Sequence, residues 1–294
     1  MIPVLFAVSA ITFTIMHLTP GGPFDRERKI PDAVRENIEK KYGLDKPLVV
    51  QYLDYMGGAV RGDLGPSFRN SRMTVTEIII SGLPVTAQLA LAALVVGIVI
   101  GVPLGILAAL RQNTVIDYLG VAFSVGGYSV PNFVLAIVLI LVFSVMLHAL
   151  PSNNWGTLAH MVMPTIALAT GPAALLARYT RSSILDVKRQ DYVRTARSKG
   201  LTEQLVVLRH MLPNALIPVV TVLGPLAAAL ITGSFIIETM FAFPGWGRQY
   251  VTAISQRDYS MIMATTLIFA LLIQLANISV DFVYTLIDPR IKLS

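Results

Sequence analysis

Long apolar stretches recur six times along the chain, and each reaches or nearly reaches the length of about 20 residues that a helix needs to cross a bilayer. None of them contains Asp, Glu, Lys or Arg, and they cover residues 2–18, 83–110, 118–147, 161–177, 211–237 and 259–280. The fourth can extend as a helix through Tyr179, and the sixth can reach Leu286. Because a lone strand cannot satisfy its backbone hydrogen bonds in lipid, all six are predicted to be transmembrane helices.

The distribution of Lys and Arg predicts the orientation of these helices, because short loops rich in both residues remain in the cytoplasm. Eight of them lie between Arg178 and His210, and the C-terminal tail carries Arg290 and Lys292. With six spans, these two regions fall on one side of the membrane, together with the turn that contains Arg111. Both termini are therefore predicted to be cytoplasmic. The first stretch has no basic residues before it and no small-residue cleavage site near Pro20, which favours an uncleaved helix over a signal peptide.

Residues 20–82 are predicted to form a small helical cap outside the membrane, since long loops translocate largely regardless of their charge. Pro31 and Gly43 mark the start and end of one helix, and Pro47 and Gly57 mark those of a second. The remaining residues, 83–294, are predicted to form the core domain with five transmembrane helices.

The composition supports a membrane protein and excludes several other classes. The 294 residues are 54% hydrophobic and only 14% charged, against about a quarter charged in soluble domains. The net charge of +6 is not gathered in a groove with interleaved aromatic residues, so no nucleic-acid partner is expected. The chain has no Cys and four dispersed His, so no metal site is predicted. It also lacks a Gly-Lys dipeptide, an H-E-x-x-H motif and a G-x-S-x-G motif, so we expect no catalytic residues and no cofactor.

Two features of the apolar stretches bear on function. Gly97, Gly101 and Gly105 recur every four residues on one helix face, a spacing that permits close helix packing, either within the chain or at a subunit interface. Ionisable residues inside the membrane normally mark an ion path, and only Asp281, near the inner end of the sixth stretch, is a candidate. A proton-coupled carrier is therefore disfavoured, and the driving energy is expected to enter elsewhere. A stand-alone channel or carrier and an intramembrane enzyme remain as alternative classes.

The basic segment between the fourth and fifth stretches has the pattern of an ordered helical element. A short amphipathic helix precedes Gly200, which can close it with a positive φ, and Thr202 can cap the next helix, which ends near Pro213. The positive charge of this segment is explained by membrane orientation and by contact with lipid headgroups. Neither of these explains the positions of Gly200 and Pro213.

Several sequence motifs resemble those of a known family. Ala196, Gly200, Leu212 and Pro213 match the cytoplasmic loop signature of ABC-importer permeases, although three other signature positions carry Arg194, Thr195 and His210 instead. The stretch DYVRTARSKGL (191–201) resembles the version in the peptide/nickel permease family. Similar strings occur along nearly the whole chain, among them YGLDKPLVVQYLDY (42–55), VPNFVLAIVLILVFS (130–144) and ETMFAFPGWGR (238–248). The chain therefore resembles the first of the two permease subunits of dipeptide and oligopeptide ABC importers.

This resemblance implies an all-α membrane protein with the type I ABC-importer permease fold, in a bacterial or archaeal inner membrane. The implied partners are a second homologous permease subunit, two cytoplasmic ATPase subunits that bind ATP and Mg, an extracytoplasmic substrate-binding protein and membrane lipid. The implied substrates are dipeptides and oligopeptides, with nickel chelates, glutathione or oligosaccharides as alternatives.

The resemblance also implies roles for two groups of residues. Residues 178–210 would form the coupling loop that receives an ATPase subunit. Within and just after it, the predicted coupling residues are Asp191, Tyr192, Arg194, Thr195, Ala196, Arg197, Lys199, Gly200, Leu201 and Pro213. The predicted external gate or binding-protein contact comprises Glu238, Phe241, Phe243, Pro244, Gly245, Trp246 and Arg248. An aromatic anchor at the membrane surface is an alternative for the FPGWG turn.

Overall fold

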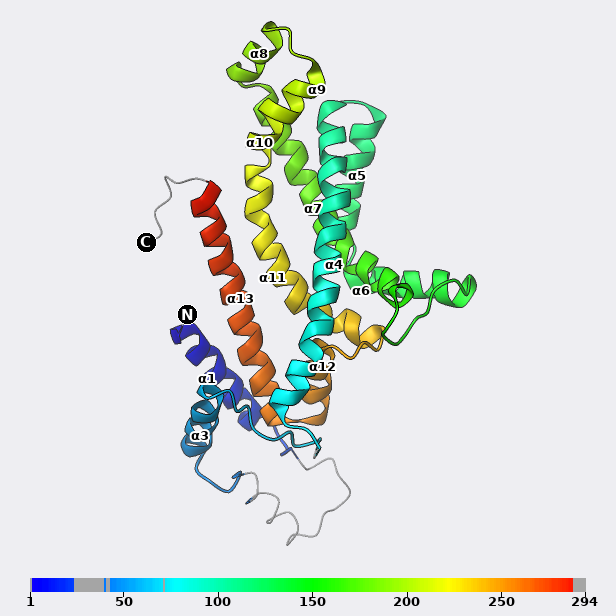
Figure 1. Ribbon diagram of the computed structural model, residues 1–294. Helices are drawn as coiled ribbons and strands as arrows, with labels where there is room; N and C mark the ends of the chain where they lie inside the picture. Colours follow the sequence, from blue (N-terminus) through cyan, green and yellow to red (C-terminus); the bar gives the residue numbers. More distant parts are fainter. Residues whose placement is uncertain (1, 24–39, 41–42, 71, 288–294) are drawn as a thin grey trace. The chain divides into compact units, whose positions relative to one another are not determined.

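A computed structural model describes residues 2–23, 40, 43–70 and 72–287, and these residues are helical with no named strand (Figure 1). The helices are α1 (Ile2–Leu18), α3 (Leu48–Val60), α4 (Val75–Leu110), α5 (Val115–Ser129), α6 (Asn132–Leu139), α7 (Leu158–Lys188), α8 (Asp191–Ser198), α9 (Glu203–Leu205), α10 (Leu212–Ala215), α11 (Ile217–Met240), α12 (Trp246–Gln256) and α13 (Tyr259–Ile287). Two π-helical segments, η1 (Ile140–Met146) and η2 (Val206–Met211), continue α6 and α9. The first predicted cap helix, from Pro31 to Gly43, lies almost entirely outside the described residues.

Four of the described helices are long and apolar enough to cross a membrane, namely α4, α7, α11 and the Tyr259–Ser279 part of α13. A fifth span results if the bent pair formed by α5 with α6 and η1 is counted as one. Helix α1 is mainly apolar but has only 17 residues. Its bounds agree with the first predicted stretch. All six predicted stretches are largely helical, with breaks within the third and, at Leu216, within the fifth.

The third stretch is not the single helix that its apolar run predicted. The chain turns by 99° between Ser129 and Asn132. Val130 is extended, with φ −81° and ψ 119°, as a residue before proline prefers to be. Pro131 itself has no backbone N–H with which to continue the hydrogen-bond ladder. Hydropathy alone does not report this break, because two backbone residues impose it; the residue in the sequence that marks it is Pro131.

The described chain forms two compact units. The first combines Met1–Thr86 with Pro244–Gln274, and the second combines Ala87–Phe243 with Leu275–Ser294. In the first unit, Tyr52 of α3 lies against α1, where its hydroxyl is 2.7 Å from the Ser9 hydroxyl. This contact fixes the amphipathic α3 beside the apolar α1.

The first unit is also held together by Asp258, which lies directly before α13 and is only 3% exposed. Its carboxylate accepts hydrogen bonds from the Met261 backbone N–H, the Ser67 hydroxyl and the Phe68 N–H. One side chain thus caps α13 and fastens the loop before α4 to it.

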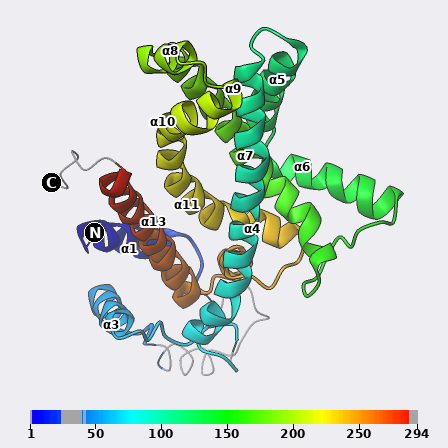
Figure 2. The ribbon, with the colours of Figure 1, turned by 45° about the horizontal axis from the view of Figure 1, so that its top comes forward.

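Helix α7 is the centre of the second unit. It packs against α5, α6 and α11, and in both views α5 lies along α7 while α6 leaves the end of α5 at a steep angle (Figures 1 and 2). The predicted glycine face of α4 meets α7 as well. A Cβ on Gly101 would lie 2.4 Å from the Ala173 carbonyl oxygen, and one on Gly105 would lie 2.5 Å from that of Ala177. A Cβ on Gly97 would lie 3.1 Å from Pro172. The three glycines therefore serve packing within the subunit.

Candidate functional site

The basic segment after α7 folds into an ordered helix–turn–helix element. Helix α8 is strongly amphipathic, and its Val193 and Ala196 are buried, at 0% and 4% exposure. They pack in one cluster with Ile184 of α7 and with Val206 and Met211 of η2. This small core explains why a basic, exposed segment is nevertheless ordered.

The turn after α8 depends on Gly200, which has a φ of +76°. L-residues with a side chain rarely adopt this conformation. No atom lies within 4 Å of the position that a Cβ on Gly200 would take. Glycine is therefore required by the backbone here and not by a close neighbour.

The outer face of the element carries most of the predicted coupling residues. Asp191, Tyr192, Arg194, Thr195 and Lys199 are exposed, Arg197 and Leu201 are half-buried, and Pro213 is exposed in α10. Ala196 is the exception, because its buried side chain supports the element from beneath. The structure thus brings together a compact surface of basic and hydroxyl groups.

Two interactions between side chains brace this surface. The Arg197 guanidinium donates two hydrogen bonds to the Glu203 carboxylate, at 3.0 and 2.7 Å, and so joins α8 to α9. These hydrogen bonds, together with the charge of Arg197, hold the pKa of Glu203 below its ordinary value. Asn214 donates to the Tyr192 hydroxyl at 3.0 Å. Thr202 stands at the N-cap position of α9 as predicted, but its side chain makes no capping hydrogen bond.

A buried ion pair near the base of the element was missed by sequence reasoning. Arg181 of α7 binds both carboxylate oxygens of Asp117 at the start of α5, at 2.5 and 2.9 Å. Asp117 is 2% exposed and also accepts from the Asn113 backbone N–H. The two partners are 64 residues apart. The only signal in the sequence was an acidic residue beside a short basic turn.

The predicted external turn is largely buried in this structure. Phe241 and Phe243 are 0% and 1% exposed, and Glu238 is fully buried with a hydrogen bond from Ser234 at 2.8 Å. In the other unit, Trp246 is fully buried and its ring lies 4.3 Å from that of Phe269. Among the remaining predicted residues of the turn, Gly245 is buried, Arg248 is half-buried and Pro244 is exposed. The turn is thus a packed element and not an exposed aromatic anchor.

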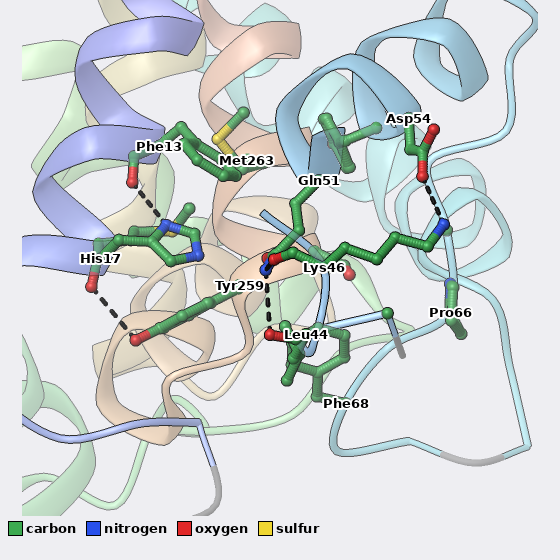
Figure 3. A pocket seen from close by; sticks show the side chains of 15 residues that line it. Phe13, His17, Leu44, Lys46, Gln51, Asp54, Pro66, Phe68, Tyr259 and Met263 are labelled. Carbon is green, nitrogen blue, oxygen red and sulfur yellow. Dashed lines mark hydrogen bonds and ion pairs between the residues drawn. The ribbon is translucent and has the colours of Figure 1, made fainter. Parts of the chain in front are cut away.

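The first unit contains a cavity of about 180 Å³ between α1, the segment before α3 and the start of α13 (Figure 3). Lys46 reaches the Asp54 carboxylate at 2.7 Å, and the Gln51 amide donates to the Leu44 carbonyl oxygen. Phe13, His17 and Tyr259 close its other side. Its polar groups largely bind one another, and the described residues contain no group of three or more His, Cys, Asp or Glu that could hold a metal ion.

The arrangement of helices is that of ABC-importer permeases. A solved inward-facing structure of the MetNI methionine ABC transporter aligns with a TM-score of 0.58 at 19% identity, over 71% of this chain and 96% of that chain. A crystal structure of an amino acid ABC transporter with histidines aligns with a TM-score of 0.54 at 19% identity, over 74% and 95%. At this identity the likeness establishes the fold alone.

The sequence comparisons identify the family. Residues 101–293 match the family described as binding-protein-dependent transport system inner membrane component, and residues 1–90 match the N-terminal part of such membrane components. The chain belongs to this family.

Two curated relatives match nearly the full chain. The dipeptide transport system permease protein DppB of Bacillus subtilis (strain 168) is 44% identical over 289 residues, which are 98% of this chain and 94% of that protein. The oligopeptide transport system permease protein OppB of Escherichia coli (strain K12) is 41% identical over 293 residues, with 99% and 96% covered.

Proposed function

We propose that this chain is a transmembrane permease subunit of an ATP-driven importer and forms half of a translocation pathway for dipeptides and oligopeptides. The names of the two relatives support a peptide substrate, because both proteins match this chain almost from end to end. Nickel chelates, glutathione and oligosaccharides are alternative cargoes of the same machinery.

The observation that carries the energy-coupling part of the proposal is the α8–Gly200–α9 element. A solvated linker has no need of a core, whereas this element buries Val193 and Ala196 and braces Arg197 against Glu203. A rigid element with an exposed basic face is suited to seat in a preformed cleft of an ATPase subunit. Because α8 follows α7 after two residues, movement of the ATPase cleft that holds α8 is transmitted to α7, the central helix of the second unit.

The proposal includes a division of labour. Two cytoplasmic ATPase subunits bind ATP and Mg and supply the energy, a second homologous permease completes the pathway, and an extracytoplasmic binding protein delivers the peptide. In this assembly the chain lies in a bacterial or archaeal inner membrane with both termini in the cytoplasm. The turn around Phe241–Phe243 and Trp246 is proposed as part of the outer gate, its buried rings representing one state of that gate.

Reconstitution separates this function from that of a stand-alone channel or carrier. The purified chain alone in proteoliposomes is expected to transport no labelled dipeptide, with or without ATP. The complex with its neighbouring permease and ATPase subunits is expected to accumulate the dipeptide when ATP and loaded binding protein are supplied. Uptake by the chain alone would overturn the importer proposal. ATP-driven uptake of a nickel chelate but not of peptides would overturn only the choice of substrate.

A further inference from the structure

Arg178 of α7 is a cation held by aromatic rings. Its guanidinium carbon lies 5.7 Å from the centroid of the Tyr128 ring of α5 and 5.8 Å from that of Tyr179. Within the described part of the chain, no hydrogen bond or ion pair is recorded for Arg178. One turn later on the same helix, Arg181 is neutralised by Asp117. The two neighbouring arginines therefore differ in that, among the described residues, Arg181 has an anionic partner and Arg178 has none.

Arg178 lies well before the C-terminal end of its helix. It lies ten residues before the end of α7 at Lys188, which corresponds to about 15 Å along the axis. Side chains on a helix tilt toward its N-terminus, which for Arg178 is the direction away from Lys188. Its partner Tyr128 lies 13 residues along α5 from Val115, about 20 Å from that end. Since α7 has 31 residues and about 20 suffice to cross a bilayer, Arg178, directly after the apolar stretch 161–177, lies at the cytoplasmic boundary of the span and not at the free end of the helix.

The cluster is open to a ligand from outside the subunit. Arg178 is exposed, and Tyr128 and Tyr179 are 61% and 38% exposed. The aromatic rings hold the guanidinium electrostatically and leave its N–H groups available. A planar guanidinium with free N–H groups matches the two oxygens of a carboxylate.

A cavity of about 270 Å³ adjoins the cluster, and Tyr128 lines both. The break between α5 and α6 supplies Asn132 to this cavity, and α7 supplies Thr170 and Pro172. Most of the other lining residues are apolar, among them Val130, Leu226 and Leu230, and the Thr170 hydroxyl already donates to the Ile166 carbonyl oxygen. The cavity therefore suits an apolar side chain more than a polar main chain.

We propose that Arg178, held by Tyr128 and Tyr179, binds the C-terminal carboxylate of a peptide during translocation, while the adjoining cavity takes the apolar side chain of the C-terminal residue. The inference rests on the proposed import of peptides, and it assigns a carboxylate site to the cytoplasmic end of the apolar part of α7. Arg178 is then a specificity-determining residue that selects substrates with a free C-terminus.

The test compares the complete complex carrying the parent chain with one carrying Arg178→Gln, reconstituted with its binding protein. Uptake of a tripeptide with a free C-terminus is measured against uptake of its C-terminal amide, each at saturating loading of the binding protein. Loss of a charge-assisted hydrogen bond weakens an interaction by about ten-fold or more, so uptake of the free acid is expected to fall about ten-fold or more. Uptake of the amide and ATP hydrolysis stimulated by the loaded binding protein are expected to remain near those of the parent complex.

Two further variants keep the result interpretable. Arg178→Lys retains the charge without the planar fork, so its uptake of the free acid should lie between those of the parent and Arg178→Gln. Arg111→Gln removes the same charge from an exposed position in the α4–α5 turn and should leave the ratio of acid to amide unchanged. If Arg178→Gln does not assemble, the intermediate ratio in Arg178→Lys still supports the proposal, and a parent-like ratio in that variant overturns it.

Each other outcome points to a different role. An equal loss for acid and amide, or no loss for either, overturns the carboxylate site. Loss of the second permease subunit from Arg178→Gln and Arg178→Lys alike, with no change in the ratio, would mean that Arg178 pairs with that subunit. An effect that requires phosphatidylglycerol and is absent in pure phosphatidylcholine vesicles would assign the charge to a lipid headgroup. Absence of peptide uptake by the parent complex would refute the proposed function itself.

Discussion

Substitution of Asp117 by Asn removes one charge from a buried pair and leaves Arg181 in place. The pair is bidentate, and the Asp117 side chain is 3% exposed while that of Arg181 is 27% exposed. The same carboxylate accepts from the Asn113 N–H in the α4–α5 turn, where Asn113 has a φ of 62°. The substitution therefore affects three segments that meet near the C-terminal end of α7, namely the α4–α5 turn, the start of α5 and α7 itself.

Breaking a buried ion pair on one side costs about 3–5 kcal/mol, because the remaining charge is left without compensation. Arg181 retains some access to solvent, so the lower end of that range, about 3 kcal/mol, is expected for Asp117→Asn. Arg181→Gln should cost a similar amount. The double variant leaves no isolated charge, and its cost should fall short of the sum of the single costs by about 1.5 kcal/mol or more.

Unfolding of the purified chain in mixed micelles with an increasing fraction of sodium dodecyl sulfate, followed by far-ultraviolet circular dichroism, measures these differences. The matched control is Asp54→Asn, which breaks the Lys46–Asp54 pair, 2.7 Å long but with both side chains more than half exposed. That pair is solvated, so its loss should not change the transition measurably. The reasoning is refuted if the Asp117 and Arg181 substitutions add within about 0.5 kcal/mol, or if Asp54→Asn is equally damaging.

Three further predictions concern other parts of the chain. Gly200→Val places a β-branched residue at positive φ at a cost of about 1 kcal/mol or somewhat more, so membrane abundance should stay near that of the parent while ATPase co-purification and uptake are strongly reduced. Substitutions at Thr114 in the opposite cytoplasmic turn should be milder. If uptake by Gly200→Val, normalised to membrane protein, equals that of the parent, α8 only anchors the chain at the membrane. Asp258→Ala leaves three donors without their acceptor and should destabilise the chain by about 2–3 kcal/mol, measured in the same micelle titration, whereas Asp258→Asn should recover part of the loss. Because Arg197 lowers the folded-state pKa of Glu203, the pair stabilises α9 above the ordinary pKa value of 4.5 and loses this effect as the pH falls through the lower folded-state pKa. With both side chains partly exposed the effect should stay below about 1 kcal/mol, seen as protection of the amides in residues 199–205, corrected for the intrinsic pH dependence of exchange, that decreases on acidification in the parent but not in Glu203→Gln.

The sequence predicted the parts of this fold that depend on local patterns. The bounds of α1 and the start of α13 followed from runs of apolar residues, because a membrane-spanning helix must satisfy its backbone within its own segment. The positive φ of Gly200 followed from a glycine placed between two helical patterns. The periodic face of Gly97, Gly101 and Gly105 predicted close packing, although only the structure identified α7 as the partner.

The rest depended on contacts between segments far apart in the chain. No local pattern links Asp117 to Arg181, or Asp258 to Ser67, since each pair is formed by the tertiary fold. The 99° turn before α6 needed the backbone restriction at Val130–Pro131, which hydropathy ignores. The burial of Trp246 and Phe241 was missed because an aromatic turn has the same composition whether it lies at a membrane surface or inside a packed unit.

The most direct test of the account is whether the α8 element contacts an ATPase subunit. The chain has no native Cys, so the Ser198→Cys variant has a single thiol, at the exposed end of α8, that can be labelled with a short photoreactive reagent before the complex is assembled. Asn153→Cys, exposed in the segment before α7, is the matched control. The account predicts a photoadduct with the ATPase subunit from Ser198→Cys and none from Asn153→Cys. An ATPase adduct from Asn153→Cys, or labelling of Ser198→Cys by an impermeant reagent added outside sealed cells, would contradict it.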